Sequence, residues 1–216
     1  MNKTVYFLID CSGSMHGNRA DAVNVAMRKI VDEAIPDIKA QKNADLDLTF
    51  LVLGFRDVGD NNNVFEIVSR TDLDDFNQWN PIPSEVFKGG TPTGAAIQAV
   101  VDDLTGSNYG DVDVNRVAPV IILVSDGMPT DGDTYDKVLE YGVKGGPNEV
   151  VLFRKALRVA LGMDVAADGK QSLERFGKLS KKMESAGIKA YYDCSEKYVD
   201  SFVEILKSVT INASLD

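Results

Sequence analysis

The chain has 216 residues, of which 44% are hydrophobic and 26% are charged, and its formal net charge is −10. This length and composition predict one soluble domain spanning residues 1–216, since single cores commonly grow to about 250 residues before they split. The acidic balance repels phosphate backbones and anionic lipids, so we expect no binding to nucleic acid or to a membrane surface.

Apolar runs mark the expected strands, which in chain order are Val5–Ile9, Leu48–Gly54, Val64–Val68, Val117–Ser125, Arg158–Met163 and Ile188–Tyr192. Several of these runs lack polar alternation, which predicts strands buried on both faces, as in a parallel sheet covered by helices. Val64–Val68 alternates in part and is the best candidate for an edge strand.

Residues with helical spacing lie between the strands. Four segments carry this spacing: Val23, Ala26, Ile30 and Ala34; Ala95–Leu104; Leu173, Phe176, Leu179 and Met183; and Tyr198, Phe202, Ile205 and Val209. We expect Pro36 to end the first helix, and Ser172 and Gly187 to bound the third. The last helix should start near Ser195. Because strands and helices alternate, the class is α/β with a mainly parallel sheet.

Two polar regions interrupt this alternation. Asp57–Asn63 is predicted to be a solvated turn, because its spacing does not match a calcium-binding EF-hand loop. Thr130–Asn148 holds a possible short helix around Tyr135–Tyr141, and Gly145-Gly146-Pro147 would break any helix there. We expect both regions to lie at the surface.

The cysteine content and the first apolar run indicate the compartment. Only two cysteines are present, Cys11 and Cys194, which is typical of a reducing compartment. Asp10 ends the first apolar run after five residues, too few for a signal peptide or a membrane span. We therefore expect a cytoplasmic protein with two reduced thiols.

The strongest local pattern is Asp10-Cys11-Ser12-Gly13-Ser14, which directly follows the first expected strand. Ligands bind at the carboxyl ends of strands in open α/β sheets, and a turn there can point Asp10, Ser12 and Ser14 at one spot. Carboxylate and hydroxyl oxygens suit Mg²⁺ or Ca²⁺. Ser, Gly and Asp also build ordinary loops and helix caps, so this pattern alone leaves both interpretations open.

Two further patterns belong to the same edge of the predicted sheet. Ser125-Asp126-Gly127 follows the fourth expected strand, and Gly89-Gly90-Thr91-Pro92-Thr93-Gly94 precedes the helix at Ala95. Each is weak alone. Their joint placement on loops that converge on one edge favours a metal site over ordinary loops.

Together these patterns resemble von Willebrand factor A (vWA) domains that carry a metal-ion-dependent adhesion site. The resemblance implies a Rossmann-like fold, an open and mostly parallel sheet with one antiparallel edge strand and helices on both faces. It implies five metal ligands: Asp10, Ser12, Ser14, Thr91 and Asp126. Mg²⁺ is the expected ion, with Mn²⁺ or Ca²⁺ as alternatives. Within the family, the sequence resembles stand-alone bacterial TerY-like proteins of tellurium resistance.

Other polar residues have simpler interpretations. His16, the only histidine, is interpreted as a loop residue and not as a ligand. We expect Asp131 and Asp133 to cap the next helix rather than tune the metal. Asp72, Asp74 and Asp75 are interpreted as a solvated helix start. The pattern does not decide whether Trp79 is buried or exposed near the site.

The predicted function is a metal-dependent protein-binding module, not an enzyme, whose cation accepts an Asp or Glu carboxylate from a protein partner. The alternative is a Mg²⁺-dependent hydrolase or phosphotransferase, because aspartates at strand ends also serve phosphoryl transfer. Against it, Ser12 stands where an Asp-x-Asp phosphatase would carry its second carboxylate, and no phosphate-binding Gly-x-x-x-x-Gly-Lys loop is present. A third possibility is a scaffold that uses the fold without a metal.

Overall fold

A six-stranded sheet forms the centre of the computed structural model, which describes residues 2–41, 46–59, 61–106, 117–194, 204–205 and 207–209. The strands are β1 (Asn2–Asp10), β2 (Asp47–Val58), β3 (Asn61–Asp72), β4 (Val120–Ser125), β5 (Leu157–Met163) and β6 (Tyr191–Cys194). They lie in the order β3-β2-β1-β4-β5-β6. Every neighbouring pair is parallel except β2 and β3, so β3 is an antiparallel edge strand, as predicted.

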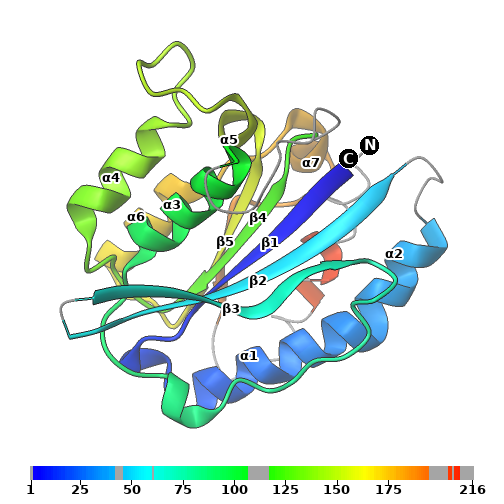
Figure 1. Cartoon of the computed structure of the whole chain (residues 1–216), viewed down its shortest axis with the longest axis horizontal. Coiled ribbons are helices and arrows are strands. Elements are labelled where there is room, and N and C mark those ends of the chain that lie inside the picture. Colours follow the sequence, from blue (N-terminus) through cyan, green and yellow to red (C-terminus); the bar gives the residue numbers. More distant parts are fainter. Residues whose placement is uncertain are drawn as a thin grey trace.

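Helices cover both faces of this sheet (Figure 1). One face packs against α1 (Asn18–Lys29), the π-helical turn η2 (Ile30–Ala34), α2 (Ile35–Gln41) and α7 (Lys181–Ser185). The other face packs against α3 (Thr93–Leu104), α4 (Gly132–Glu140), α5 (Val151–Lys155) and α6 (Ala167–Phe176). Two short 3-10 helices, η1 (Gly13–Met15) and η3 (Ser84–Val86), lie in the loops. The predicted α/β class and layering are confirmed.

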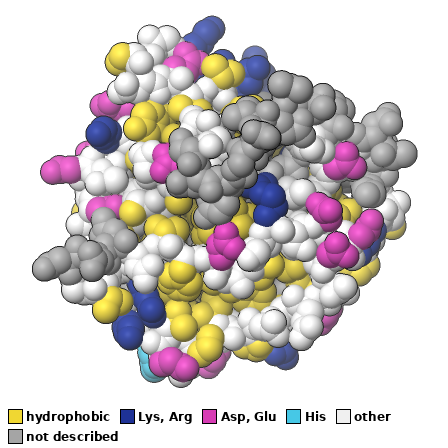
Figure 2. Space-filling model, in the orientation of Figure 1, with side chains coloured by type: hydrophobic (Ala, Val, Ile, Leu, Met, Phe, Trp, Pro, Cys, Tyr) yellow, Lys and Arg dark blue, Asp and Glu magenta, His cyan; other side chains and the backbone are white. Residues whose placement is uncertain are grey.

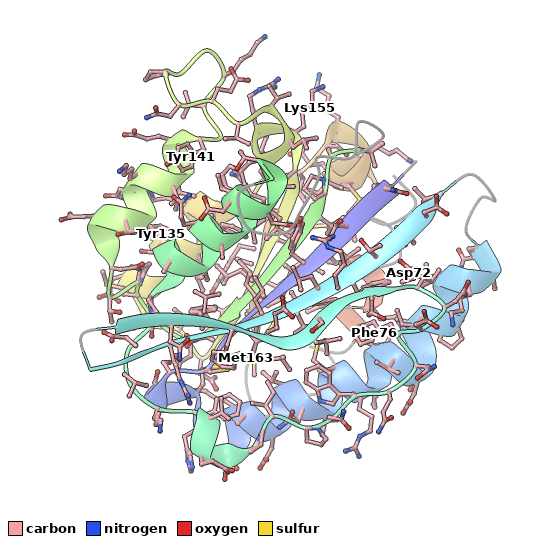
Figure 3. All side chains as sticks on the ribbon, in the orientation of Figure 1. Asp72, Phe76, Tyr135, Tyr141, Lys155 and Met163 are labelled. Carbon is pink, nitrogen blue, oxygen red and sulfur yellow. The ribbon has the colours of Figure 1, made fainter. Side chains whose placement is uncertain are left out.

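Strand β1 shows why the sheet needs two apolar faces. Phe7 and Ile9 point into the core shared with α1, whereas Tyr6 and Leu8 point into the core shared with α3. All four are fully buried, which explains the apolar run without alternation. Figure 3 shows Tyr135 on α4 on one side of the sheet, while Phe76 lies toward α2 on the other.

The prediction that Pro36 ends the first helix is wrong. Helical structure continues from Asn18 to Gln41, and Pro36 lies in the first turn of α2, directly after the π-helical turn Ile30–Ala34. Proline inside continuous helical structure removes one backbone hydrogen bond and its ring crowds the preceding turn, so it needs extra room there. The wider π-helical turn thus allows the helix to pass the proline.

The stripe from Leu173 to Met183 forms two helices instead of the one predicted. Ser172 lies inside α6, and Ser180 is the N-cap of α7, where its hydroxyl oxygen accepts a hydrogen bond from the Met183 amide at 3.2 Å. Between the two helices, Lys178 and Arg158 exchange backbone hydrogen bonds of 2.7 Å in both directions. This pairing with β5 holds the chain extended, and Gly187 ends α7 as expected.

Several predicted boundaries also shift. Strands β2 and β3 extend into the supposed polar turn, so Asp57 belongs to a hairpin strand. Asp72 ends β3 and is followed by a turn, not by a helix. Strand β4 starts at Val120 and β6 at Tyr191, later than predicted. Of the predicted last helix, residues 204–205 and 207–209 are helical, whereas Ser195, Tyr198 and Phe202 lie outside the described residues.

None of the helices within the described ranges is long and apolar enough to span a membrane.

Candidate metal site

The three loops singled out in the sequence meet at the carboxyl end of the sheet. Strands β1 and β4 are parallel neighbours with Ile9 opposite Val124, so their last residues, Asp10 and Ser125, lie side by side. The loop before α3 joins them through its backbone, because the Gly13 amide donates to the Gly89 carbonyl at 2.9 Å. Register and loop docking together bring residues that are distant in the sequence to one place.

Gly89 makes this docking possible. Its φ is +80°, and a Cβ atom there would lie 1.5 Å from the Asp57 carbonyl oxygen. Only glycine fits such a close approach without displacing the backbone. Gly90 and Asp57 then exchange two backbone hydrogen bonds of 3.0 Å, which fix the loop against the end of β2.

Asp10 is fully buried, and its carboxylate is held by neutral donors. Oδ1 accepts from the Ser12 amide at 2.8 Å, and Oδ2 accepts from the Ser125 hydroxyl at 2.6 Å. No cationic side chain pairs with it among the residues that the structure describes. Burial raises the pKa of Asp10 to about 6, although these hydrogen bonds act in the opposite direction.

Hydroxyl groups connect the first loop to Asp126. The Ser12 and Ser14 hydroxyl oxygens lie 3.0 Å apart, and the Ser14 hydroxyl donates to Asp126 Oδ1 at 2.8 Å. Ser12 and Asp126 are buried, while Ser14 is exposed. Four of the five predicted ligands therefore lie around one spot.

Thr91, the fifth predicted ligand, is held in place through its backbone. Its amide donates to the Thr130 hydroxyl at 3.1 Å, and its carbonyl accepts from the Thr130 amide at 2.9 Å. The residue is buried beside the other loops. Its position next to the site thus depends on the loop after β4 as well as on its own loop.

Arg19 belongs to this site and was missed by the sequence analysis. Its Nη1 donates to Asp126 Oδ2 at 2.6 Å and to the Ser14 carbonyl at 2.9 Å. The residue lies in the first turn of α1, outside the three loops, so only the fold brings it to Asp126. The signal that could have found it is its short distance in sequence from Ser14.

Asp131 does cap a helix, but not the one expected. Although it is the N-cap residue of α4, its carboxylate accepts from the Gly94 and Ala95 amides of α3, at 3.0 and 2.8 Å. Burial raises its pKa, and the two backbone hydrogen bonds counteract that effect. The contact ties the loop that carries Thr91 to the loop after Asp126.

The remaining candidates have the simpler roles. His16 is exposed. Trp79 is buried, and its Nε1 donates to Asn24 Oδ1 at 3.2 Å. Cys11 and Cys194 are free buried thiols, as expected, and burial raises the pKa of each to about 12. A thiol with so high a pKa is a poor metal ligand at neutral pH, because only the thiolate binds metals well.

The donor set fits a hard divalent cation. Two carboxylates and three hydroxyl groups offer only oxygen, which Mg²⁺ and Ca²⁺ prefer. Within the described ranges, no group of three or more His, Cys, Asp and Glu side chains could hold a metal ion. A cation at this edge would therefore depend on Ser12, Ser14 and Thr91 as much as on the two aspartates.

Comparisons with known proteins agree with this architecture. The family model described as von Willebrand factor type A domain matches residues 4–146. Heavy chain 4 of the inter alpha-trypsin inhibitor from Mus musculus is 27% identical over 149 residues, which are 68% of this chain and 14% of that protein. The chain therefore corresponds to a small part of that much longer relative.

Solved structures are similar in fold. The pilus adhesin SpaC from Lactobacillus rhamnosus GG matches with a TM-score of 0.66 at 17% identity, over 98% of this chain and 31% of that one. The tip protein Mfa5 of type V pili from Porphyromonas gingivalis matches through its vWF domain, with a TM-score of 0.60 at 11% identity over 100% and 96%. Proximal thread matrix protein 1 from the mussel byssus, with a zinc-occupied MIDAS motif, gives a TM-score of 0.60 at 12% identity over 98% and 48%.

Proposed function

Because the chain belongs to the von Willebrand factor type A domain family, whose members are protein-interaction modules, we propose that it captures a protein partner through a divalent cation. The proposed ligands are Asp10, Ser12, Ser14, Thr91 and Asp126. The cation is Mg²⁺, with Mn²⁺ or Ca²⁺ as alternatives. A structural neighbour with zinc in its MIDAS motif supports a metal at this edge of the fold.

The observation that carries the proposal is the environment of Asp10. A fully buried carboxylate normally has a cationic partner, because removing an isolated charge from water costs several kcal/mol even after relaxation. Among the described residues its hydrogen-bond partners are all neutral: the amide and the hydroxyl of Ser12 and the hydroxyl of Ser125. A divalent cation held between Asp10 and Asp126 would supply the missing positive charge.

The cation would also supply the attraction for a partner. Three neutral hydroxyl ligands leave much of its charge uncompensated, so a carboxylate from Asp or Glu of the partner can complete the coordination. The chain carries a net charge of −10, which repels an acidic partner at long range. Figure 2 shows both signs of charge spread over the viewed face, with hydrophobic side chains between them. The attraction must therefore be local.

We propose a binding role without catalysis. Asp10 and Asp126 are the only carboxylates of the proposed set, and the described surroundings offer no histidine in contact with them to act as a base. The cytoplasmic location and a place in a tellurite or stress response belong to the proposal as well. They are supported by the two buried free cysteines and by the resemblance of the motifs to TerY-like proteins.

Thermal unfolding with and without metal tests the proposal. Mg²⁺ or Mn²⁺ should raise the Tm of the metal-free protein, because a ligand that binds only the folded state stabilises it by mass action. Asp126→Ala should remove this increase, while Asp133→Ala, which removes an exposed carboxylate of α4, should keep it. If the Tm rises equally in Asp126→Ala, the site is elsewhere.

Partner binding needs its own experiment. Proteins retained by the immobilised chain in Mg²⁺ should be released by EDTA, and Thr91→Ala should fail to retain them. Replacing one Asp or Glu of the captured partner with Asn or Gln should have the same effect as EDTA. Equal retention in EDTA would contradict a metal-bridged contact.

A further inference from the structure

The two carboxylates of the proposed site are in opposite electrostatic situations. Asp10 has no cationic partner among the described residues, whereas Asp126 Oδ2 lies 2.6 Å from Arg19 Nη1. The Asp126 side chain is only 2% exposed, so little water screens this ion pair. The other oxygen, Oδ1, is engaged by the Ser14 hydroxyl at 2.8 Å.

Arg19 also holds Ser14, because its Nη1 donates to the Ser14 carbonyl at 2.9 Å. One guanidinium group thus contacts two of the five proposed ligands. Its Nε is buried and has no hydrogen-bond partner, so the contact with the site depends on Nη1. The arrangement places a positive charge of the chain itself where Asp126 would meet the cation.

We propose, on the basis of the metal site proposed above, that Arg19 competes with the divalent cation for Asp126. In the metal-free protein the guanidinium is the counter-ion of Asp126. Metal binding replaces it at Oδ2, since a divalent ion and a guanidinium group on the same small carboxylate repel each other. The side chain of Arg19 is 26% exposed, so it lies at the rim and has a route to solvent when it leaves.

This competition predicts that loss of the Arg19 charge lowers the stability of the metal-free protein and raises its affinity for the metal. Removing the Arg19 charge should weaken the metal-free protein, because among the described residues it leaves buried Asp126 with Ser14 as its one side-chain partner. The same change should strengthen metal binding, because the cation no longer has to displace a charged group. A residue that only positioned Ser14 or Asp126 would have the opposite effect on the metal, since its loss would disorder two ligands.

Isothermal titration of the full chain with Mn²⁺ or Mg²⁺ tests the competition. We expect Arg19→Gln to bind the metal about tenfold more tightly than the wild type and to have a lower Tm without metal, a tenfold change being worth about 1.4 kcal/mol. Arg28→Gln is the matched control, because Arg28 is an exposed arginine in the last turn of the same helix. It removes the same charge from the chain and should change the affinity little.

The outcomes separate this inference from the proposed function. If wild type and Arg19→Gln both fail to bind any metal, the proposed function is wrong and the competition falls with it. If the variant binds more weakly, only the competition is wrong and Arg19 positions the ligands. If both bind with equal affinity, only the competition is wrong and Arg19 does not affect metal binding.

A second measurement covers the case in which Arg19→Gln does not fold. In ¹⁵N spectra of the wild type, the Arg19 Nε–H resonance, assigned by its absence in Arg19→Met, should shift on addition of Mg²⁺. The Arg28 resonance should stay in place. An unchanged Arg19 signal in a protein that binds Mg²⁺ would contradict release of the guanidinium.

Discussion

Two buried aspartates, Asp10 at the carboxyl end of β1 and Asp103 near the end of α3, have different partners for their negative charge. The Asp103 carboxylate accepts from the Tyr6 hydroxyl and forms an ion pair with Arg70 of β3, so its counter-ion is part of the chain. Within the part of the chain that the structure describes, Asp10 accepts hydrogen bonds from Ser12 and Ser125 and has no cationic partner. Both side chains are buried to 1% exposure or less.

The two aspartates therefore differ in where their positive charge comes from. Arg70 also donates to the Thr4 hydroxyl at 3.0 Å, which fixes its position across β1 and β3. The positive charge in that network is the guanidinium group of Arg70, so no bound ion is needed, and the network joins α3 to the sheet. Asp10 at the carboxyl edge has no such cation among the described residues, and the proposed divalent ion would supply it.

The largest expected effect comes from breaking the pair of Asp103 and Arg70. Arg70→Met should destabilise the protein by about 3 kcal/mol, because it leaves the charge of Asp103 buried without its cation. Chemical denaturation measures the loss. Arg175→Met is the control, since its partner Asp136 is 62% exposed and such pairs contribute about 1 kcal/mol or less. Equal losses in the two variants would mean that the Asp103 network is not a buried ion pair in solution.

The second largest effect should be a gain in stability and not a loss. Asp10→Asn should stabilise the metal-free protein at neutral pH, on the order of 2 kcal/mol, because it removes a charge whose burial is unfavourable. The amide side chain can still accept from Ser12 and contact Ser125. Denaturation in EDTA gives the gain, and the same variant should lose the metal-induced rise in Tm. A less stable Asp10→Asn in EDTA would show that Asp10 has a cation in the chain itself.

The pH dependence follows from the same burial. The pKa of Asp10 is raised to about 6 in the folded protein, from an unfolded value of 3.8. The folded state then binds the proton more tightly, so the contribution of Asp10 to stability is highest below pH 3.8 and is lost as the pH rises through about 6. Subtracting the curve of Asp10→Asn from that of the metal-free wild type should isolate this fall. A difference that stays flat across this window would contradict a raised pKa.

The sequence predicts the framework well because the strands carry strong local signals. Fully buried runs such as Phe7–Ile9 have one compatible environment in an α/β protein, the centre of a sheet covered by helices on both faces. Errors arise where tertiary contacts override local patterns. Pro36 fits inside helical structure because a π-helical turn precedes it, and Lys178 is pulled out of a helix by pairing with β5.

The candidate site also contains residues that the sequence predicts and residues that only the packing reveals. The sequence places Asp10, Ser12, Ser14 and Asp126 on loops that the fold brings together, although their role as metal ligands stays a prediction. Arg19 was missed, because its contact with Asp126 joins residues 107 positions apart and only its nearness to Ser14 in the sequence points to the site. Asp131 was expected to cap its own helix, yet its carboxylate caps α3, since the close approach of α3 and α4 is a property of the packing.

Asp131 is an intermediate case between the two aspartates and should give a smaller effect. No cationic side chain pairs with it among the described residues, but two amides at the N-terminus of α3 donate to it and the helix dipole favours its charge. Asp131→Ala should cost about 1 kcal/mol, as for the loss of an N-cap. Urea denaturation at neutral pH checks this value. The metal affinity should also fall, because the loop of Thr91 loses one of its anchors. An unchanged affinity would mean that the remaining contacts of that loop, with Gly13, Asp57 and Thr130, are enough to position it.

An effect as small as that of Asp131 is expected for Ser125, which holds Asp10 without being one of the proposed ligands. Its hydroxyl donates to Asp10 Oδ2 at 2.6 Å, so Ser125→Ala leaves one oxygen of a buried carboxylate without a partner. We expect a loss of about 1 kcal/mol in the metal-free protein. In Asp10→Asn the buried charge is absent, so the same substitution should cost less there. A double-mutant cycle in EDTA measures this coupling. If Ser125→Ala costs as much in the Asp10→Asn background as in the wild type, the hydroxyl stabilises the loop and not the charge, and Asp10 would need a different explanation for its burial.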